Sequence, residues 1–212
     1  MIKVVDNNTE VANDMPKLDS PFVREERNGG YYVKDEINEG YDWVFESDDV
    51  IAVEKLDGTN VSVIIENGNI NAVFNRKNRV APFNKNKQFI TKGILNSLNR
   101  GYLNLKDGQW YGELVGPKVQ GNPYKLDEHL WIPFQNYSWR KLKYNSWGDY
   151  PKTFEAIKGW FDYGLIPLFY SRIHGISFDK AMKECRPEGI VFTDTKTKKM
   201  AKLRYDMFED ID

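Results

Sequence analysis

The chain has 212 residues, of which 41% are hydrophobic and 29% charged, a composition typical of a soluble protein with a sizeable core. Its 30 lysines and arginines nearly balance 31 acids, and the net charge of -1 excludes attraction of nucleic acid by the protein as a whole. Any such binding needs a local basic surface. No stretch is apolar enough for a signal peptide or a membrane span, and the single cysteine, Cys185, excludes an internal disulfide. We therefore expect a cytoplasmic protein without membrane association.

Strands dominate the predicted elements. Residues 1–20 are polar, and we expect them to form a loose or peripheral N-terminal lead-in. After them, apolar stretches predict strands at 50–54, 61–66, 69–74, 110–116, 130–137, 166–170 and 189–194. Asn67 and Gly68 separate two of these strands in the pattern most typical of a tight β-hairpin.

Three helices are predicted between and after these strands. Residues 86–99 place apolar side chains at helical spacing, and residues 151–163 begin with Pro151 and end before Gly164. A short helix follows Ser177 as its N-cap. Its inward side is expected to hold Phe178, Ala181, Met182 and Cys185. The pattern predicts one α+β domain over 21–212, in which packed antiparallel sheets are flanked by helices.

The segment EKLDGTN, residues 54–60, carries the chemistry. Lys55 follows a buried strand, where lost solvation lowers the pKa of a lysine and leaves more of it as the free amine that attacks phosphorus. Asp57 is placed to accept a sugar hydroxyl, and Asn60 to bond either a substrate or the turn. The alternative is a surface turn, because Asp-Gly-Thr-Asn is also good turn chemistry.

EKLDGTN matches the Lys-x-Asp-Gly signature, and the chain resembles the covalent nucleotidyltransferase superfamily, which contains DNA ligases, RNA ligases and mRNA capping enzymes. The later landmarks of that superfamily each have a candidate here, in the same order along the chain. They are Arg76 in FNRKNRV, Glu113 in YGELVG, Phe134 in WIPFQNY, Glu188 in PEGIVF, and Lys202 with Arg204 in KMAKLRY. The resemblance covers residues 50–206 and implies a ligase-type, ATP-grasp-like adenylyltransferase domain.

The resemblance also implies a role for each residue. Lys55 is the catalytic nucleophile, and Lys202 and Arg204 neutralise the charge that develops on the phosphates of ATP. Arg76 is expected to assist them, with Lys77 and Arg79 close enough in sequence to substitute for it. The metal, Mg²⁺ or Mn²⁺, is assigned to Glu188 and Glu113, since hard carboxylate oxygens suit it. Glu113 has the alternative role of holding the ribose. Phe134 is expected to stack on adenine, and the set expected to bind the nucleotide is completed by Glu54, Asp57, Asn60 and Lys202.

The closest resemblance within the superfamily is to RNA ligases of the bacteriophage type that seals nicks in double-stranded RNA. Glu54 directly precedes Lys55 as in those enzymes, whereas similar DNA ligases carry a glutamate two residues before the lysine. Two positions depart from the pattern: Asp57 stands where histidine is frequent, and Arg204 replaces a lysine. The chain stops about ten residues after Lys202, so we expect no C-terminal OB-fold domain.

These features predict an ATP-dependent RNA ligase that forms lysyl-AMP at Lys55, transfers AMP to a 5′-phosphate and joins that end to a 3′-hydroxyl. A minimal DNA ligase, a capping guanylyltransferase and a non-catalytic nucleotide-binding module are the alternatives. RNA is the expected partner, DNA its alternative, and a partner protein that adds nucleic-acid surface stays open. The aromatic and basic segment 137–150 either stacks on bases or packs on the core. His129 and His174 lack the spacing of metal ligands, and surface or capping roles are expected.

Overall fold

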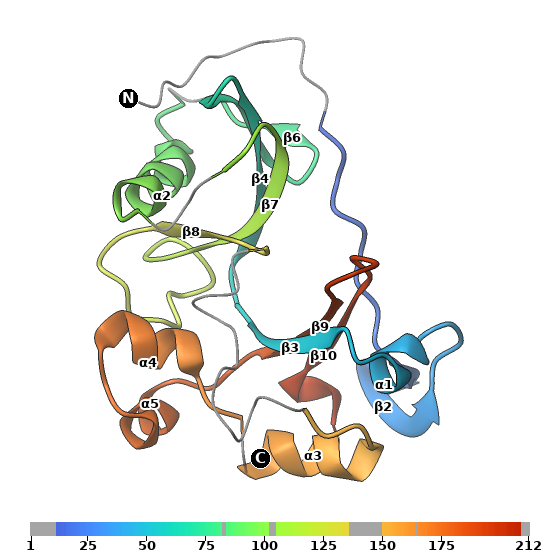
Figure 1. The fold of residues 1–212 in the computed structure, drawn as a ribbon. Coiled ribbons are helices and arrows are strands. Elements are labelled where there is room, and N and C mark those ends of the chain that lie inside the picture. The colour runs from blue at the N-terminus through green and yellow to red at the C-terminus, as the bar shows by residue number, and fades with distance from the viewer. Residues whose placement is uncertain (1–11, 82–83, 102–104, 136–149, 164, 209–212) are drawn as a thin grey trace. The chain divides into compact units, whose positions relative to one another are not determined.

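The computed structural model describes residues 12–81, 84–101, 105–135, 150–163 and 165–208 (Figure 1). They divide into two compact units. Among the described residues, unit 1 covers 12–16 and those from 57 to 135, and unit 2 covers those from 17 to 56 and from 150 to 208. Both units combine antiparallel sheets with helices, which confirms the α+β prediction. The predicted boundaries, a lead-in over 1–20 and one domain over 21–212, stay a prediction.

Unit 1 is built on a five-stranded sheet in the order β6-β5-β4-β7-β8. Its strands are β4 (Thr59–Glu66), β5 (Asn69–Asn75), β6 (Asn78–Arg79), β7 (Gly108–Val115) and β8 (Leu130–Pro133). Helix α2 (Gln88–Asn99) covers one face of this sheet (Figure 1). Alternate side chains of a strand point to opposite faces, and the apolar ones of this sheet point to the face that packs on the helix. The buried side chains of this core include Val61, Val63, Ile90, Ile94, Leu114 and Trp131.

The predicted hairpin is confirmed. Asn67 and Gly68 have φ angles of 49° and 71°, the left-handed conformation that a tight two-residue turn requires. The Asp107 carboxylate accepts hydrogen bonds from both backbone nitrogens, at 2.9 Å from Asn67 and 3.1 Å from Gly68. Strands β4 and β5 are thereby fixed in antiparallel register on either side of the turn.

Unit 2 holds a three-stranded sheet in the order β10-β9-β3 and a two-stranded sheet, β1-β2. The strands are β1 (Phe22–Arg27), β2 (Gly30–Ile37), β3 (Val50–Lys55), β9 (Gly189–Asp194) and β10 (Met200–Arg204). The helices are α1 (Trp43–Glu46), α3 (Phe154–Tyr163), α4 (Leu168–His174), α5 (Phe178–Glu184) and the short 3₁₀ helix η2 (Tyr205–Met207). One face of the three-stranded sheet packs into a core with α3, and its buried members include Ala52, Ile190, Phe192, Leu203, Ile157 and Phe161.

The predicted strand at 166–170 is wrong, because this segment enters helix α4. Its residues Leu168, Phe169, Tyr170 and Ser171 are all buried, and a run that is apolar on every side does not distinguish strand from helix. Two features favour the helix, one of them a contact with a residue far away in the chain. The Glu54 carboxylate accepts a hydrogen bond from the backbone N–H of Phe169 at its start, and Gly175 ends it with a φ of 62°.

Helix α5 confirms the short helix after Ser177, whose side chain accepts a hydrogen bond from the backbone N–H of Lys180. Ala181 and Cys185 are buried as predicted. The prediction that Met182 points inward is wrong, since its side chain is 46% exposed. The inward face is formed by Phe178, Ala181 and Cys185, which are three and four residues apart, and Met182 lies at the edge of that face.

Several element limits differ from the prediction. Helix α3 begins at Phe154, after Pro151, and strand β8 ends at Pro133. Of the aromatic and basic segment 137–150, the structure describes only Tyr150, and residues 137–149 lie outside the described residues. Strands β1 and β2 and helix α1 were not predicted. Among the residues that the structure describes, no helix has the length and apolarity needed to cross a membrane.

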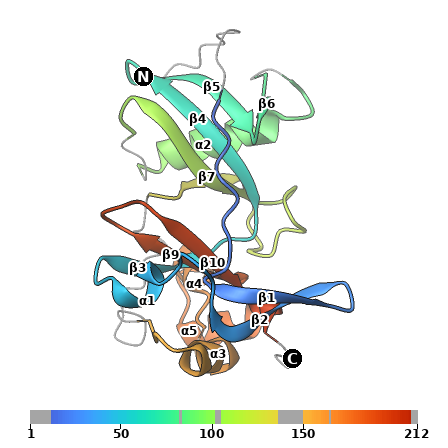
Figure 2. The ribbon, with the colours of Figure 1, turned by 90° about the vertical axis from the view of Figure 1, so that its right-hand side faces the viewer.

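The described part of the lead-in makes specific contacts. In unit 1 it runs along β4 and β7, as the blue trace in Figure 2 shows, and the Gln109 amide bonds both the N–H and the C=O of Asn13 at 3.2 and 2.9 Å. The Tyr111 hydroxyl donates to the same carbonyl at 2.7 Å. In unit 2 the backbone N–H of Lys202 donates to the carbonyl oxygen of Asp19 at 2.9 Å. The described residues of the lead-in are therefore hydrogen-bonded within their own units: Asn13 in unit 1 and Asp19 in unit 2.

Candidate active site

The three-stranded sheet of unit 2 brings the predicted catalytic cations onto one face. Lys55 on β3 and Arg204 on β10 both pair with Gly189 on the central strand β9, so the three residues form one row across the sheet. Lys202 pairs with Val191 in the next row on the same face, because residues two apart on a strand share a side. The opposite face is the one packed in the core.

Glu188, the residue before β9, contacts the predicted nucleophile. Its Oε2 atom lies 2.6 Å from Nζ of Lys55, and both side chains are mostly buried, at 24% and 21% exposure. Nζ also lies 3.5 Å from the carbonyl oxygen of Leu56. A short, charge-assisted bond of this kind fixes the long lysine side chain in one position. Lys55 and Glu188 are 133 positions apart in the chain, and only the order of the motifs related them in the sequence. In the structure their side chains are in direct contact.

Lys55, Gly189 and Arg204 form the row that we call the catalytic row, and glycine is required at its centre. A Cβ atom on Gly189 would lie 2.1 Å from the carbonyl oxygen of Leu203 and 2.8 Å from the Cα atom of Arg204. Any other residue would force β9 and β10 apart. The row consequently places Lys55 and Arg204 on either side of a position that carries no side chain.

Lys202 sits in a strongly positive environment. Partial burial, followed by the charges of Lys55, Arg204 and Lys17, lowers the pKa of its ammonium group, and Asp19 opposes that shift. Holding cations close together costs folding free energy, and such clusters are typical of sites that bind phosphates. Lys17 and Asp19 were not predicted as site residues, because no motif or spacing marks them. Arg204 forms an ion pair with Asp206, with 3.0 Å between Nε and Oδ1.

Glu54 points to the other face of the sheet from Lys55. It is fully buried, and its Oε2 atom accepts the hydrogen bond from the Phe169 backbone at 2.7 Å. The carboxylate thus anchors the beginning of α4 beneath the catalytic row. Its predicted role in binding the nucleotide stays a prediction.

In unit 1, predicted nucleotide-binding residues share the sheet face opposite α2. Asn60 on β4 pairs with Glu113 on β7, and Ser62 pairs with Tyr111 in the next row. Phe134 continues the pairing of β7 with β8 and donates its backbone N–H to the Tyr111 carbonyl at 2.9 Å. We call this surface the polar face and define it by Asn60, Ser62, Glu113, Tyr111 and Phe134.

The residues between Lys55 and the polar face are held tightly. The backbone N–H of Asp57 donates to the hydroxyl of Tyr124 at 2.6 Å, and Tyr124 is itself buried. A Cβ atom on Gly58 would lie 2.4 Å from the Leu114 carbonyl oxygen and 2.7 Å from Cγ of Glu113. The glycine is therefore needed for Glu113 to lie against the chain. Tyr124 was missed because it occupies an irregular loop with no pattern of its own.

Arg76 lies at the exposed turn between β5 and β6, with a φ of 54°. Arg79, which the sequence left as a substitute, pairs with Phe74 on β5, and Phe74 pairs with Ser62 of the polar face. The register thus places Arg79 on the polar face. We regard Arg79 as the better candidate for the arginine that follows the nucleophile.

Metal binding was assigned to Glu188 and Glu113. Within the described part of the chain, no group of three or more His, Cys, Asp or Glu side chains is arranged to hold a metal ion. A Mg²⁺ or Mn²⁺ ion bound through one carboxylate, waters and substrate phosphates does not need such a group, and Glu188 beside Lys55 has the right chemistry for it. The assignment of the metal to Glu188 and Glu113 stays a prediction. His129 accepts a hydrogen bond from the backbone N–H of Lys118, and the surface or capping roles expected for His129 and His174 stay a prediction.

The fold and these residues are typical of a nucleotidyltransferase domain. The model of the RNA ligase family matches residues 48–204, most of the chain, and the protein belongs to that family. No protein with a curated description matches the sequence.

Solved structures of a Naegleria gruberi RNA ligase resemble the chain at low identity. A variant with ATP and Mn has 18% identity and a TM-score of 0.45, over 92% of this chain and 61% of that one. A variant with AMP and Mn has 16% identity and a TM-score of 0.44, over 91% and 61%. A structure of the RNA ligase with pyrophosphate also has 16% identity and a TM-score of 0.44, over 91% of this chain and 61% of that one. This chain spans about three fifths of the length of those proteins.

Proposed function

We propose that this protein is an ATP-dependent RNA ligase with Lys55 as its nucleophile. The observation that carries the proposal is the Lys55–Glu188 pair at 2.6 Å, set in one row with Arg204 and beside Lys202. Membership of the RNA ligase family supports the reaction class. A surface turn does not need a fixed lysine, a carboxylate and two further cations on one side of a sheet.

The first step forms a bond between Nζ of Lys55 and the α-phosphorus of ATP, and breaks the bond to the bridging oxygen of pyrophosphate. Nζ must arrive as a free amine with its lone pair in line with the leaving oxygen. Glu188 holds Nζ in position, so little conformational freedom is left to lose. The second step transfers AMP to a 5′-phosphate on RNA, and in the third a 3′-hydroxyl attacks that end and releases AMP.

Lys202 and Arg204 neutralise the negative charge that grows on the phosphate oxygens. Their positions on a folded sheet are set before ATP binds, which is what makes such charges effective. A divalent metal, when bound, supplies further charge neutralisation to the phosphates, and Glu188 would hold it. Asn60, Glu113 and Phe134 are proposed to contact the ribose and the adenine.

The finer assignment is to ligases of the bacteriophage type that seal nicks in double-stranded RNA. Glu54 directly before Lys55 and the Gly-Thr-Asn sequence after Asp57 support it. Burial of Glu54 gives this position a physical meaning, since its carboxylate secures α4 under the strand that carries Lys55.

The proposal is tested by labelling. The protein is incubated with α-labelled ATP or GTP and Mg²⁺ or Mn²⁺ and run on a denaturing gel, beside Lys55→Ala and the control Lys158→Ala on α3. The expected result is a band from ATP alone that vanishes only in Lys55→Ala. A folded wild-type protein that takes no label under these conditions sinks the proposal.

Substrate choice is tested separately. Labelled protein is mixed with the same nicked duplex made of RNA or of DNA, each with a 5′-phosphate and a 3′-hydroxyl. Faster sealing of the RNA duplex is expected. Faster sealing of the DNA duplex would transfer the protein to the DNA ligases while leaving the role of Lys55 unchanged.

A further inference from the structure

One part of the chain carries basic residues without any acid. Between Glu66 and Asp107 there are 40 residues, which include eight lysines and arginines and no aspartate or glutamate. The whole protein, by contrast, has slightly more acids than bases. The local excess lies entirely in unit 1 and spans β5, β6 and α2.

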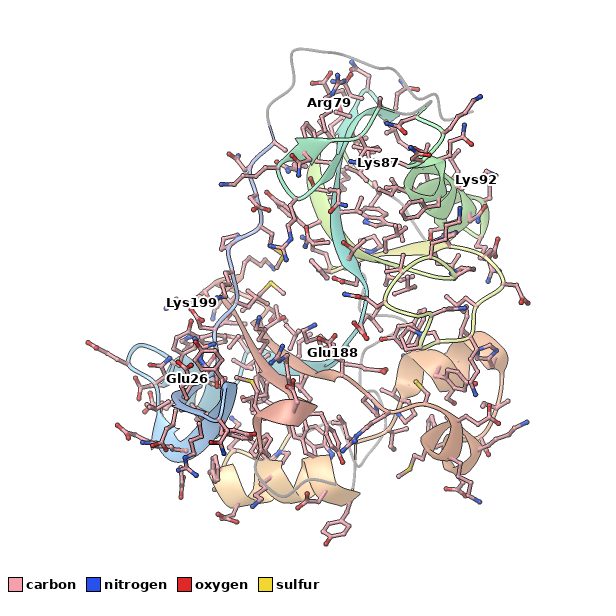
Figure 3. The ribbon with its side chains drawn as sticks, turned by 180° about the vertical axis from the view of Figure 1, so that it is seen from behind. Glu26, Arg79, Lys87, Lys92, Glu188 and Lys199 are labelled. Atoms are coloured by element: carbon pink, nitrogen blue, oxygen red, sulfur yellow. The ribbon has the colours of Figure 1, made fainter. Side chains whose placement is uncertain are left out.

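Four lysines of this stretch form what we call the basic strip: Lys77, Lys85, Lys87 and Lys92. Lys77 is exposed at the turn between β5 and β6, and Lys85 is exposed before α2. Lys87 is half-buried at the N-cap of α2, and Lys92 is exposed on the helix. Figure 3 labels Lys87 and Lys92 on α2 and Arg79 on β6.

Ion pairing distinguishes the strip from the cations of unit 2. Among the described residues, none of its four lysines forms an ion pair. Unit 2 is different, because many of its cations are paired with acids: Arg24, Arg27, Lys34, Lys55, Lys180, Lys196 and Arg204. Positive charge in the strip is therefore available to an anion from solution.

Helix stability does not explain these charges either. The positive end of the helix dipole lies at the N-terminus of α2, where acids stabilise and cations destabilise by about 0.3–1 kcal/mol each. Lys87 occupies the N-cap without a side-chain cap, and the first turn contains no acid. The start of α2 therefore lacks the acidic and capping residues that stabilise a helix N-terminus. Sequences depart from such local preferences mainly where function requires other residues.

The positive surface continues past α2. Burial, together with the charges of Lys118 and Lys92, lowers the pKa of His129, which places both lysines within electrostatic range of that ring. The backbone of Lys118 also donates to Nε2 of His129 at 3.3 Å. Lys118 therefore extends the same surface beyond the helix.

We propose that the basic strip binds the phosphates of the RNA strand on which this protein acts. The identity of the polyanion rests on the proposed function, and the strip supplies the local basic surface that a protein of net charge -1 needs to hold one. Its extent favours a strand over a single phosphate. From the β5–β6 turn to α2, which packs on β7 and β8, the strip crosses three strand spacings, or roughly 15 Å. That is the rise of about four nucleotides.

The test replaces Lys85, Lys87 and Lys92 together by glutamine. Its matched control replaces Lys152, Lys158 and Lys183 of unit 2 by glutamine, which changes the net charge of the protein equally. Affinity for a single-stranded RNA and for a nicked RNA duplex is measured by fluorescence anisotropy over a range of salt concentrations. Each phosphate contact on a single strand contributes about 0.7 to the slope of log affinity against log salt.

The strip variant is expected to lose about two units of that slope and up to about a hundredfold in affinity near 0.1 M salt. The control variant is expected to keep both. Equal affinity and slope in the strip variant and the wild type would overturn the proposal, as would no RNA binding by the wild type at low salt. Thermal unfolding of both variants checks that each is folded.

Lys55 labelling by ATP separates this proposal from the function on which it rests. All three proteins are expected to label equally, because the replaced lysines lie outside the catalytic row. Loss of RNA affinity in a protein whose wild type never labels would retain the strip as a polyanion surface and reject the ligase. Normal labelling with unchanged RNA affinity would retain the ligase and reject the strip.

Discussion

Nζ of Lys55 and Oε2 of Glu188 lie 2.6 Å apart, although the two residues are 133 positions apart in the chain. The contact depends on the pairing of β3 with β9, in which Lys55 lies opposite Gly189, the neighbour of Glu188. Lys55, the proposed nucleophile, and the residue next to Glu188 are thus positioned by backbone hydrogen bonds. A sheet is a stiffer support for them than a loop would be.

Glu188→Gln is expected to fold normally and to lower the rate of Lys55 labelling by about a hundredfold or more, because it removes a charge at the reacting centre. Glutamine keeps the size of the side chain and an oxygen for Nζ. The labelling rate at saturating ATP measures the effect. Glu155→Gln, on the exposed side of α3, serves as control, and an unchanged rate in Glu188→Gln would contradict the assignment.

Lys202→Met is expected to reduce labelling by about a hundred- to a thousandfold and yet to raise the unfolding temperature at neutral pH. The lowered pKa of Lys202 means that its charged form destabilises the fold. This cost is complete below the pKa in the folded protein and disappears as the pH approaches the ordinary value of 10.5. The gain in Tm should therefore shrink at alkaline pH. A Tm below that of the wild type at pH 7 would show that Lys202 stabilises the fold.

Glu54→Ala is expected to destabilise the protein by about 1–3 kcal/mol, since it leaves the buried Phe169 N–H without its acceptor. Glu54→Gln keeps an acceptor oxygen and should cost about 1 kcal/mol less. Urea unfolding of the two variants gives the comparison. Equal stability of all three proteins would mean that the carboxylate does not secure α4.

Gly58→Ala is expected to cost about 1–3 kcal/mol and most of the labelling activity, because its Cβ would collide with Leu114 and displace Glu113. Gly159→Ala on α3 is the matched control. No atom lies within 4 Å of its Cβ position, and alanine should stabilise a helix by up to about 1 kcal/mol there. If both variants gain stability, the packing described around Gly58 is wrong.

Local patterns predicted the elements that depend on local physics. Asn67 and Gly68 mark the β4–β5 hairpin because few residues adopt the left-handed conformation that the turn requires. Ser177 marks the start of α5 through its side-chain oxygen. The strand at 166–170 failed because a contact with Glu54, more than 100 residues earlier, selects a helix there. No window of the sequence contains that contact.

The residues of the candidate site also fall into those that the sequence predicts and those that only the structure identifies. Lys55, Glu188, Lys202 and Arg204 follow from a motif order, and the structure brings them to one sheet face. The choice between Arg76 and Arg79 needed the strand register, which no motif supplies. Tyr124 and Lys17 could not be found in advance, because their importance comes only from the atoms beside them.

Within the part of the chain that the structure describes, strand β3 has one neighbour in its sheet, which is β9. A ribosome makes residues 50–55 well before it makes residues 189–194. Until then β3 has no strand beside it in its sheet, and Lys55 has no Glu188. A translation product that stops before β9 therefore lacks the ion pair altogether.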